Sequence, residues 1–125
     1  MNFTTHVSIY EQIVDYVSGK ILEREWSGGD RIPSVRDLAV RLEVNPNTVQ
    51  RSYSQLQERG LVINQRGVGY FVADDAYLRA RASRRERFER VDVPRIAREM
   101  ELLQIDIDEM GRMVRAYRDG KGETT

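Results

Sequence analysis

Residues 32–72 read IPSVRDLAVRLEVNPNTVQRSYSQLQERGLVINQRGVGYFV, and this stretch decides the fold. Apolar residues recur at helical spacing first over 34–42 and again over 46–59, with a short polar break between the two runs. Two β-prone runs, 61–63 and 70–72, then flank a loop that contains two glycines. Two short helices joined by a tight turn and followed by a hairpin predict a winged helix-turn-helix.

The helix boundaries in this stretch are marked by residues with known capping preferences. Ser34 can cap the first helix by accepting a hydrogen bond from a free amide. Asn45 is a good N-cap for the second helix, and Pro46 suits the first helical position because no amide hydrogen bond is lost there. Gly60 can take the left-handed conformation that ends a helix near Arg59. The second helix therefore starts only a few residues after the first one stops.

The second helix has one apolar and one polar face. Val49, Ser52, Tyr53 and Leu56 are expected to pack inward, while Asn47, Gln50, Arg51 and Ser54 face outward with Thr48 at the flank. Amide side chains can pair with adenine and arginine with guanine in the major groove. A merely solvated helix surface is the alternative, but such surfaces usually carry lysine and glutamate. The polar face therefore favours DNA recognition.

Two further places in the stretch suit contacts with DNA. Arg36 lies near the start of its helix, where free amides and the positive end of the helix dipole favour a phosphate. Arg66 and Gly67 at the hairpin tip suit insertion toward the minor groove or its phosphates. At both places, an arginine that only faces solvent is the alternative.

The flanking segments complete a mainly α architecture with a small β-hairpin, an α+β fold. A capping box at Ser8 and Glu11 predicts a helix over about 8–25. After the hairpin, a helix is expected from about Asp75 to Arg90, followed by an interruption over 91–94 and a further helix that starts at Pro94.

The last predicted helix carries an apolar seam whose residues are spaced alternately by four and three. Its members are Ile96, Met100, Leu103, Ile107, Met110, Val114 and Tyr117. Three heptads of this kind predict a helix pair or coiled coil. Since the small N-terminal domain cannot cover this seam, a two-fold partner is the economical solution, and we expect a homodimer. The expected organisation is a DNA-binding domain over 1–73, a two-helix dimerisation segment over 74–118 and a disordered tail over 119–125.

Composition excludes several other classes of protein. The chain of 125 residues has no cysteine, one histidine and a formal net charge of zero. We therefore expect no metal site and no cofactor, since Asp106, Asp108 and Glu109 would scatter around a helix. No catalytic set of residues emerges, so an enzyme is not expected. No apolar run approaches the roughly 20 residues that span a bilayer, and the N-terminus lacks the features of a signal peptide, so we expect no membrane partner and a cytoplasmic location.

The chain resembles the GntR family of bacterial transcriptional regulators over roughly residues 8–73. The matching elements are Tyr10-x-Gln12-Ile13, GDRIPSVRDLA at 29–39, Asn47-Thr48-Val49 through Tyr53 and Leu56, Gly60-Leu61, and Gly67-x-Gly69-Tyr70-Phe71-Val72. The run 44–51, VNPNTVQR, and the short C-terminal part look like the YtrA-type branch, whose members have two C-terminal helices for dimerisation. The resemblance implies a winged helix that binds operator DNA as a dimer.

The resemblance also implies which residues contact DNA. They are Arg36, Asn45, Asn47, Thr48, Gln50, Arg51, Arg66 and Gly67. Many members of the family carry an arginine where this chain has Pro46, so that contact is absent and the base read there is expected to differ.

The sequence thus predicts a dimeric repressor that binds a near-palindromic operator, with the second helix of the motif in the major groove and the wing at the minor groove. The alternative is a winged-helix module for protein interaction or assembly, with the heptad helix as its interface. Neither reading identifies an effector molecule.

Overall fold

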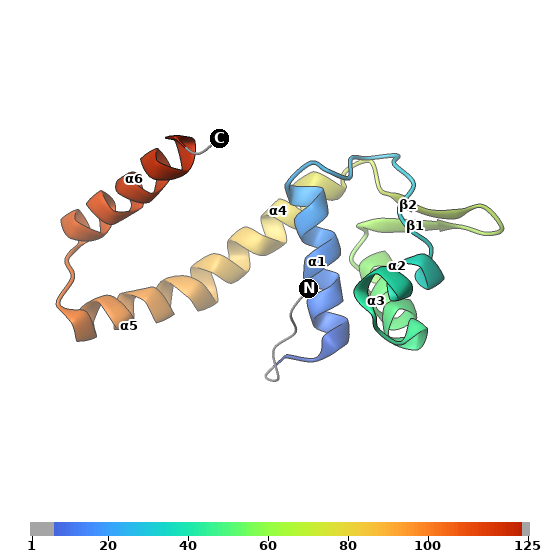
Figure 1. Cartoon of the computed structure of the whole chain (residues 1–125), viewed down its shortest axis with the longest axis horizontal. Helices are drawn as coiled ribbons and strands as arrows, with labels where there is room; N and C mark the ends of the chain where they lie inside the picture. Colours follow the sequence, from blue (N-terminus) through green and yellow to red (C-terminus); the bar gives the residue numbers. More distant parts are fainter. Residues whose placement is uncertain (1–6, 124–125) are drawn as a thin grey trace. The chain divides into compact units, whose positions relative to one another are not determined.

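The computed structural model describes residues 7–123, with side chains as far as residue 120. The elements in chain order are α1 (Ile9–Leu22), α2 (Val35–Leu42), α3 (Pro46–Glu58), β1 (Val62–Gln65), β2 (Gly69–Val72), α4 (Ala76–Arg87), the π-helical turn η1 (Phe88–Asp92), α5 (Val93–Leu103) and α6 (Ile107–Glu123) (Figure 1). The predicted fold class, mainly helical with one β-hairpin, is confirmed. The chain divides into two compact units, Met1–Arg84 and Arg85–Thr125.

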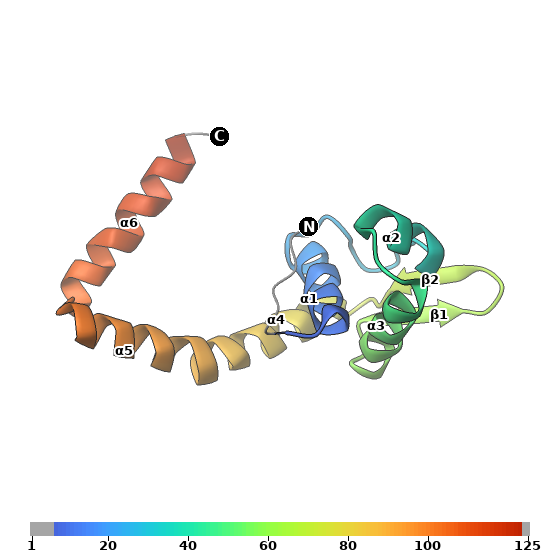
Figure 2. The same cartoon turned by 60° about the horizontal axis from the view of Figure 1, so that its bottom comes forward.

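The core of the first unit lies where α1, α2, α3 and the hairpin meet (Figure 2). Its largest fully buried side chains are Ile13, Val14, Val17 and Ile21 from α1, Leu38 from α2, Val49, Tyr53 and Leu56 from α3, and Val72 from β2. The apolar residues that recur at helical spacing in the sequence are therefore the ones that become buried in the core when the chain folds.

The turn between α2 and α3 forms as its capping residues predict. The Ser34 hydroxyl accepts a hydrogen bond of 3.0 Å from the Asp37 amide at the start of α2. Glu43 ends α2 in the left-handed conformation, with φ of 56°. The side-chain oxygen of Asn45 accepts a hydrogen bond of 2.8 Å from the Asn47 amide and caps α3. Only residues 43–45 separate the two helices, as a helix-turn-helix requires.

The wing is the antiparallel hairpin of β1 and β2, with Val62 opposite Val72 and Gln65 opposite Gly69. The Val68 amide donates a hydrogen bond of 2.9 Å to the Gln65 carbonyl, which closes a β-turn at the tip. Gly67 has φ of 77° at the third position of this turn, a conformation that glycine adopts without steric cost.

Helix α1 is shorter than the sequence predicted. It ends at Leu22 with Glu23 as its C-cap, and Arg24 follows in the left-handed conformation with φ of 61°, so the expected extension to residue 25 is wrong. The Arg24 guanidinium lies 3.8 Å from the centre of the Tyr77 ring, and this contact connects the end of α1 to the first turn of α4. Ser8 occupies the N-cap position, but its side chain accepts no hydrogen bond from the first turn, so the predicted capping box does not form.

The predicted interruption over 91–94 is absent. The chain instead passes from α4 to α5 through η1, where the Val93 amide bonds to the Phe88 carbonyl. This wider turn places the ring of Pro94, which has no amide, at the start of α5, so proline does not break the helix.

The long heptad helix predicted near the C-terminus is two helices. Gln104 takes the left-handed conformation with φ of 55° and ends α5, and the Asp106 side chain then caps α6 by accepting a hydrogen bond of 2.8 Å from the Glu109 amide. The seam is therefore divided between α5 and α6, and a continuous three-heptad helix is wrong. Residues 119–123, expected to be disordered, continue α6, while residues 124–125 lie outside the described residues.

Candidate nucleic-acid interface

The outward face of α3 is exposed in the way the helical pattern predicts. Val49, Ser52, Tyr53 and Leu56 are each 0% exposed, whereas Asn47, Gln50, Arg51 and Ser54 are exposed and Thr48 is half-buried. The apolar side is fixed in the core, so the helix cannot rotate without losing that burial. The structure therefore holds a row of amide, hydroxyl and guanidinium groups toward solvent.

A series of polar contacts connects α3 to the wing and to the segment before α2. The Gln50 side-chain amide donates a hydrogen bond of 3.3 Å to the Tyr70 hydroxyl on β2. The Tyr70 ring packs edge-on against Tyr53 with ring centres 4.8 Å apart. The Tyr53 hydroxyl in turn donates a hydrogen bond of 2.6 Å to the Pro33 carbonyl. Burial raises the pKa of Tyr53 well above its usual range, so this hydroxyl remains a neutral donor.

Arg51 is positioned by α1. Its guanidinium carbon lies 3.7 Å from the centre of the Tyr10 ring. The Ser52 hydroxyl lies 3.0 Å from the Tyr10 carbonyl and 2.9 Å from the Thr48 carbonyl, so the same residue of α1 also contacts the inward side of α3. Stacking uses the flat face of a guanidinium and leaves its in-plane N–H donors for other groups.

The N-terminal end of α3 and the start of α2 carry the other predicted residues of the helices. Asn45 uses its side-chain oxygen to cap α3, which leaves its side-chain NH₂ as the group able to contact a ligand. Arg36 is exposed at the second position of α2, next to the amides of that helix's first turn. Both places combine the positive end of a helix dipole with hydrogen-bond donors, an arrangement that favours anions.

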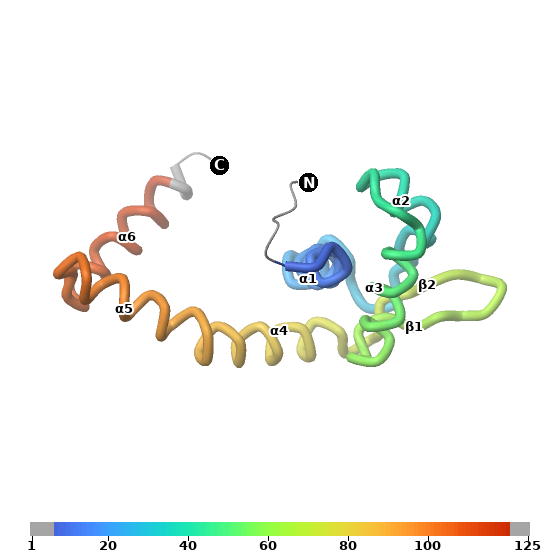
Figure 3. The backbone as a smooth tube through the Cα atoms, turned by 90° about the horizontal axis from the view of Figure 1, so that it is seen from below, coloured from blue at the N-terminus to red at the C-terminus, as the bar shows by residue number. Residues whose placement is uncertain are grey.

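The wing tip presents Arg66 and Gly67 to solvent. Both lie in the turn of the hairpin, which extends away from the helices of the first unit (Figure 3). The structure thus presents the predicted residues on three elements of one unit: α2, α3 and the wing.

Sequence reasoning noted Tyr10 and Tyr70 only as part of the family resemblance and did not predict that they contact Arg51 and Gln50. Tyrosine at a half-buried position near a polar helix face is a weak signal, because its partners come from elements distant in sequence. The sequence also gave Arg31 no role, although the structure places its main chain beside β2.

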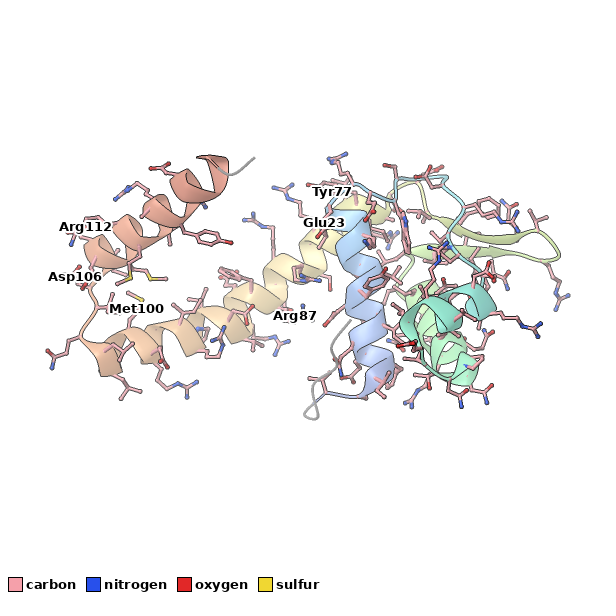
Figure 4. All side chains as sticks on the ribbon, viewed as in Figure 1. Glu23, Tyr77, Arg87, Met100, Asp106 and Arg112 are labelled. Atoms are coloured by element: carbon pink, nitrogen blue, oxygen red, sulfur yellow. The ribbon has the colours of Figure 1, made fainter. Side chains whose placement is uncertain are left out.

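The second unit leaves much of the predicted apolar seam uncovered. Leu103 is 60%, Ile107 77% and Tyr117 69% exposed, and Val114 is also exposed. Ile96, Met100 and Met110 are half-buried, and the Met100 side chain points into the space between α5 and α6 (Figure 4). Much of the seam on α5 and α6 is therefore exposed and available for contact with another molecule.

Among the described residues, no cluster of three or more potential ligands is placed to hold a metal ion. In this same part of the chain, every helix is too short or too polar to cross a membrane.

Comparison with known proteins identifies the family. The family model described as bacterial regulatory proteins of the gntR family matches residues 9–72. YhcF of Bacillus subtilis, an uncharacterized helix-turn-helix transcriptional regulator, is 42% identical over 74 residues, which are 59% of this chain and 61% of that protein. The transcriptional repressor YtrA of the same organism is 38% identical over 68 residues, which are 54% of this chain and 52% of that protein. The matched stretches thus cover only about half to three fifths of these curated relatives.

A solved structure extends the similarity to nearly the whole chain. A GntR family transcriptional regulator from Listeria monocytogenes is 32% identical, with a TM-score of 0.76, and the match covers 91% of this chain and 98% of that one. The similarity to YtrA supports the YtrA-like branch that the sequence indicated. The exposed polar helix, the wing and these matches agree: the chain belongs to the GntR family of DNA-binding transcriptional regulators.

Proposed function

We propose that this protein is a homodimeric repressor that binds a near-palindromic operator, with α3 in the major groove and the wing at the minor groove. The observation that carries the proposal is the exposed polar face of α3, held between a capped helix-turn-helix turn and the wing. Membership of a family of DNA-binding regulators supports it independently.

Base recognition is assigned to the outward face of α3. Asn47 and Gln50 carry amides that can donate to and accept from one adenine, and Arg51 carries paired N–H donors that match one guanine. Gln50 and Arg51 each already have a partner, Tyr70 and Tyr10, in the free protein. These contacts restrict the side chains before DNA arrives, which reduces the conformational entropy lost on binding.

Contacts with the DNA backbone are assigned to the helix starts and to the wing. Arg36 is exposed at the first turn of α2, and Asn45 and Thr48 lie at the first turn of α3, where free amides favour phosphate oxygens. Arg66 and Gly67 at the wing tip reach the minor groove or its phosphates. Such contacts fix the register of the protein on the duplex.

The dimer is assigned to the seam on α5 and α6. Four of its seven apolar side chains are exposed, Leu103, Ile107, Val114 and Tyr117, and contact with a second copy removes them from water. A two-fold dimer places two copies of α3 in successive major grooves about 34 Å apart, which requires two inverted half-sites. Repression is supported by the relative YtrA, which is a transcriptional repressor, and occupancy of a promoter is sufficient for it.

The test is fluorescence anisotropy at physiological salt with two labelled duplexes. One duplex is enriched from a random-sequence pool by the full chain, and the other is a scrambled version of the same composition. We expect the enriched duplex to contain inverted repeats and to bind on the order of a thousand-fold more tightly than the scrambled one. Equal affinity for the two duplexes would refute sequence-specific binding, and a single half-site without inverted symmetry would refute the dimeric mode.

A further inference from the structure

Arg31 is built into the edge of the wing by its main chain. It forms an isolated antiparallel bridge with Phe71 on β2. On either side of this bridge, the Ile32 amide donates a hydrogen bond of 3.0 Å to the Tyr70 carbonyl, and the Val72 amide donates one of 2.9 Å to the Asp30 carbonyl. The segment before α2 is therefore hydrogen-bonded to β2 on both sides of Arg31, which holds the backbone of Arg31 beside the hairpin.

The side chain of Arg31 runs along the hairpin and lies over Gly69. A Cβ placed on Gly69 would be 2.9 Å from Arg31 Nε and 3.2 Å from one terminal guanidinium nitrogen. Gly69 is the first residue of β2 and lies opposite Gln65, directly beside the turn that carries Arg66. The guanidinium of Arg31 is therefore next to the wing tip, although its backbone enters from a different part of the sequence.

Arg31 has a free charge as well as a fixed position. Its side chain is exposed, and none of the described residues forms a hydrogen bond or an ion pair with it. Some exposed arginines of this chain are instead paired with carboxylates, such as Arg79 with Asp75 at 2.6 Å and Arg90 with Glu86 at 2.8 Å. A cation held beside the wing tip without a carboxylate is available to an external anion.

We propose that Arg31 binds a DNA backbone phosphate on the side of the wing that faces away from α3. Successive residues of a strand point to opposite faces of a sheet. Tyr70 points toward α3, where it contacts Tyr53 and Gln50, so the Gly69 position and the guanidinium over it lie on the other face. A wing at the minor groove has one sugar-phosphate strand on each side, and Arg31 binds the strand farther from the recognition helix. The inference rests on the proposed DNA-binding mode.

Gly69 has a role in this arrangement that differs from the role of Gly67. Gly67 has open space around its missing side chain, and its φ serves the turn. A Cβ at Gly69 would be too close to the Arg31 guanidinium, which would then have to move, and the φ of 146° at Gly69 also disfavours other residues. The glycine thus creates the surface on which Arg31 lies.

The experiment compares Arg31→Gln with Arg59→Gln in the full chain, on the enriched and scrambled duplexes described above. Arg59 is also exposed and unpaired among the described residues, but it lies at the C-terminal end of α3. Loss of one phosphate contact reduces the slope of log affinity against log salt by about 0.9 for each chain bound. Arg31→Gln should show this reduction and bind both duplexes roughly three- to tenfold more weakly at about 0.1 M salt, because phosphates carry no sequence information. Arg59→Gln should match the wild type.

A second measurement locates the contact and does not depend on the folding of the variant. Single phosphates of the enriched duplex are replaced in turn by uncharged methylphosphonates, and the wild-type chain is measured on each. We expect a loss of affinity at a phosphate across the minor groove from the major-groove footprint, and no loss at that phosphate with Arg31→Gln. Arg31→Lys retains the charge and should keep most of the salt slope.

The outcomes separate this inference from the proposed function. A wild-type chain without preference for the enriched duplex overturns the proposed function. A wild-type chain that prefers it, with the same salt slope for Arg31→Gln and Arg59→Gln and no sensitive phosphate beyond the wing, overturns only the Arg31 contact.

Discussion

The side-chain amide nitrogen of Gln50 lies 3.3 Å from the Tyr70 hydroxyl, so a residue of α3 is in direct contact with a strand of the wing. The Tyr70 ring is itself fixed by its edge-on packing against the buried Tyr53. A side chain proposed to read a base is thus oriented by the element proposed to bind the minor groove. A substitution at Tyr70 on the wing should therefore also change base recognition by Gln50.

This relationship predicts that Tyr70→Phe weakens sequence discrimination more than it weakens DNA binding in general. The substitution keeps the ring on Tyr53 but removes the acceptor for Gln50, which then loses its fixed orientation. We expect a several-fold loss of affinity for the enriched duplex and an unchanged affinity for scrambled DNA, measured by anisotropy at constant salt. Gln50→Ala is the matched variant, and the double variant should lose little more than Gln50→Ala alone. Additive losses would show that the hydrogen bond does not orient Gln50.

Arg51 gives a prediction about base specificity. Arg51→Ala should cost about 1–3 kcal/mol of specific binding and relax the preference at one base pair in each half-site. Arg51→Lys should restore much of the affinity for scrambled DNA but not the base preference, because lysine lacks the planar pair of donors. A panel of single base substitutions measures both effects. If Arg51→Lys retains the full preference at every position, Arg51 acts only on phosphates.

The helix-turn-helix and its polar face could be predicted from sequence because their signals are local. Ser34, Asn45 and Pro46 mark helix starts by chemistry that operates within three residues, and the burial of Val49 and Tyr53 follows from helical periodicity. Each of these features is visible in a short window of the chain.

The features that could not be predicted depend on contacts between distant segments or on rare backbone conformations. The orientation of Gln50 depends on a partner 20 residues away. The end of α5 depends on Gln104 in a left-handed conformation that residues other than glycine seldom adopt. Because the apolar residues keep their heptad spacing on both sides of Gln104, the sequence pattern does not indicate that the helix ends there. Asp106 was expected to lie on the surface of a continuous helix, so its role as the cap of α6 was not predicted. The contact residues themselves stay predictions until DNA binding is measured.

Tyr53 predicts how stability depends on alkaline pH. Burial raises the pKa of Tyr53 in the folded protein, whereas the unfolded chain ionises near the usual value of 10.0. Below that pH both states hold the proton, and above it the unfolded state holds fewer protons, so the free energy of unfolding falls as pH rises. The fall from this one group is at most about 1.4 kcal/mol per pH unit.

The measurement is urea unfolding from pH 8 to about 11 with wild type and Tyr53→Phe. The variant should be about 1 kcal/mol less stable at pH 8, because it loses the hydrogen bond to the Pro33 carbonyl, and should lose less stability on going to high pH. Parallel curves for the two proteins would mean that Tyr53 does not cause the alkaline loss.

Glu43 predicts a stabilising substitution in the turn of the motif. Its φ of 56° is unfavourable for a residue with a Cβ, and it is the residue that ends α2. Glu43→Gly should raise the free energy of unfolding by about 0.5–1 kcal/mol, since glycine relieves the left-handed strain. Denaturant unfolding provides the measurement, and Glu43→Ala is the control that removes the carboxylate but retains the Cβ. A gain of equal size in Glu43→Ala would assign the effect to charge and not to backbone conformation.

Ile107 tests whether the seam on α5 and α6 forms the proposed dimer. It is 77% exposed at the start of α6, so an aspartate there costs little in a monomer but places a charge in an apolar contact between copies. Ile107→Asp should shift the chain from dimer to monomer in sedimentation equilibrium and lower operator affinity about 100-fold or more, because the second half-site is no longer tethered. Ala116→Asp puts the same charge at an exposed position of α6 outside the seam and should leave both properties unchanged. A dimer that survives Ile107→Asp, or one that is equally sensitive to Ala116→Asp, would place the interface elsewhere than on the seam.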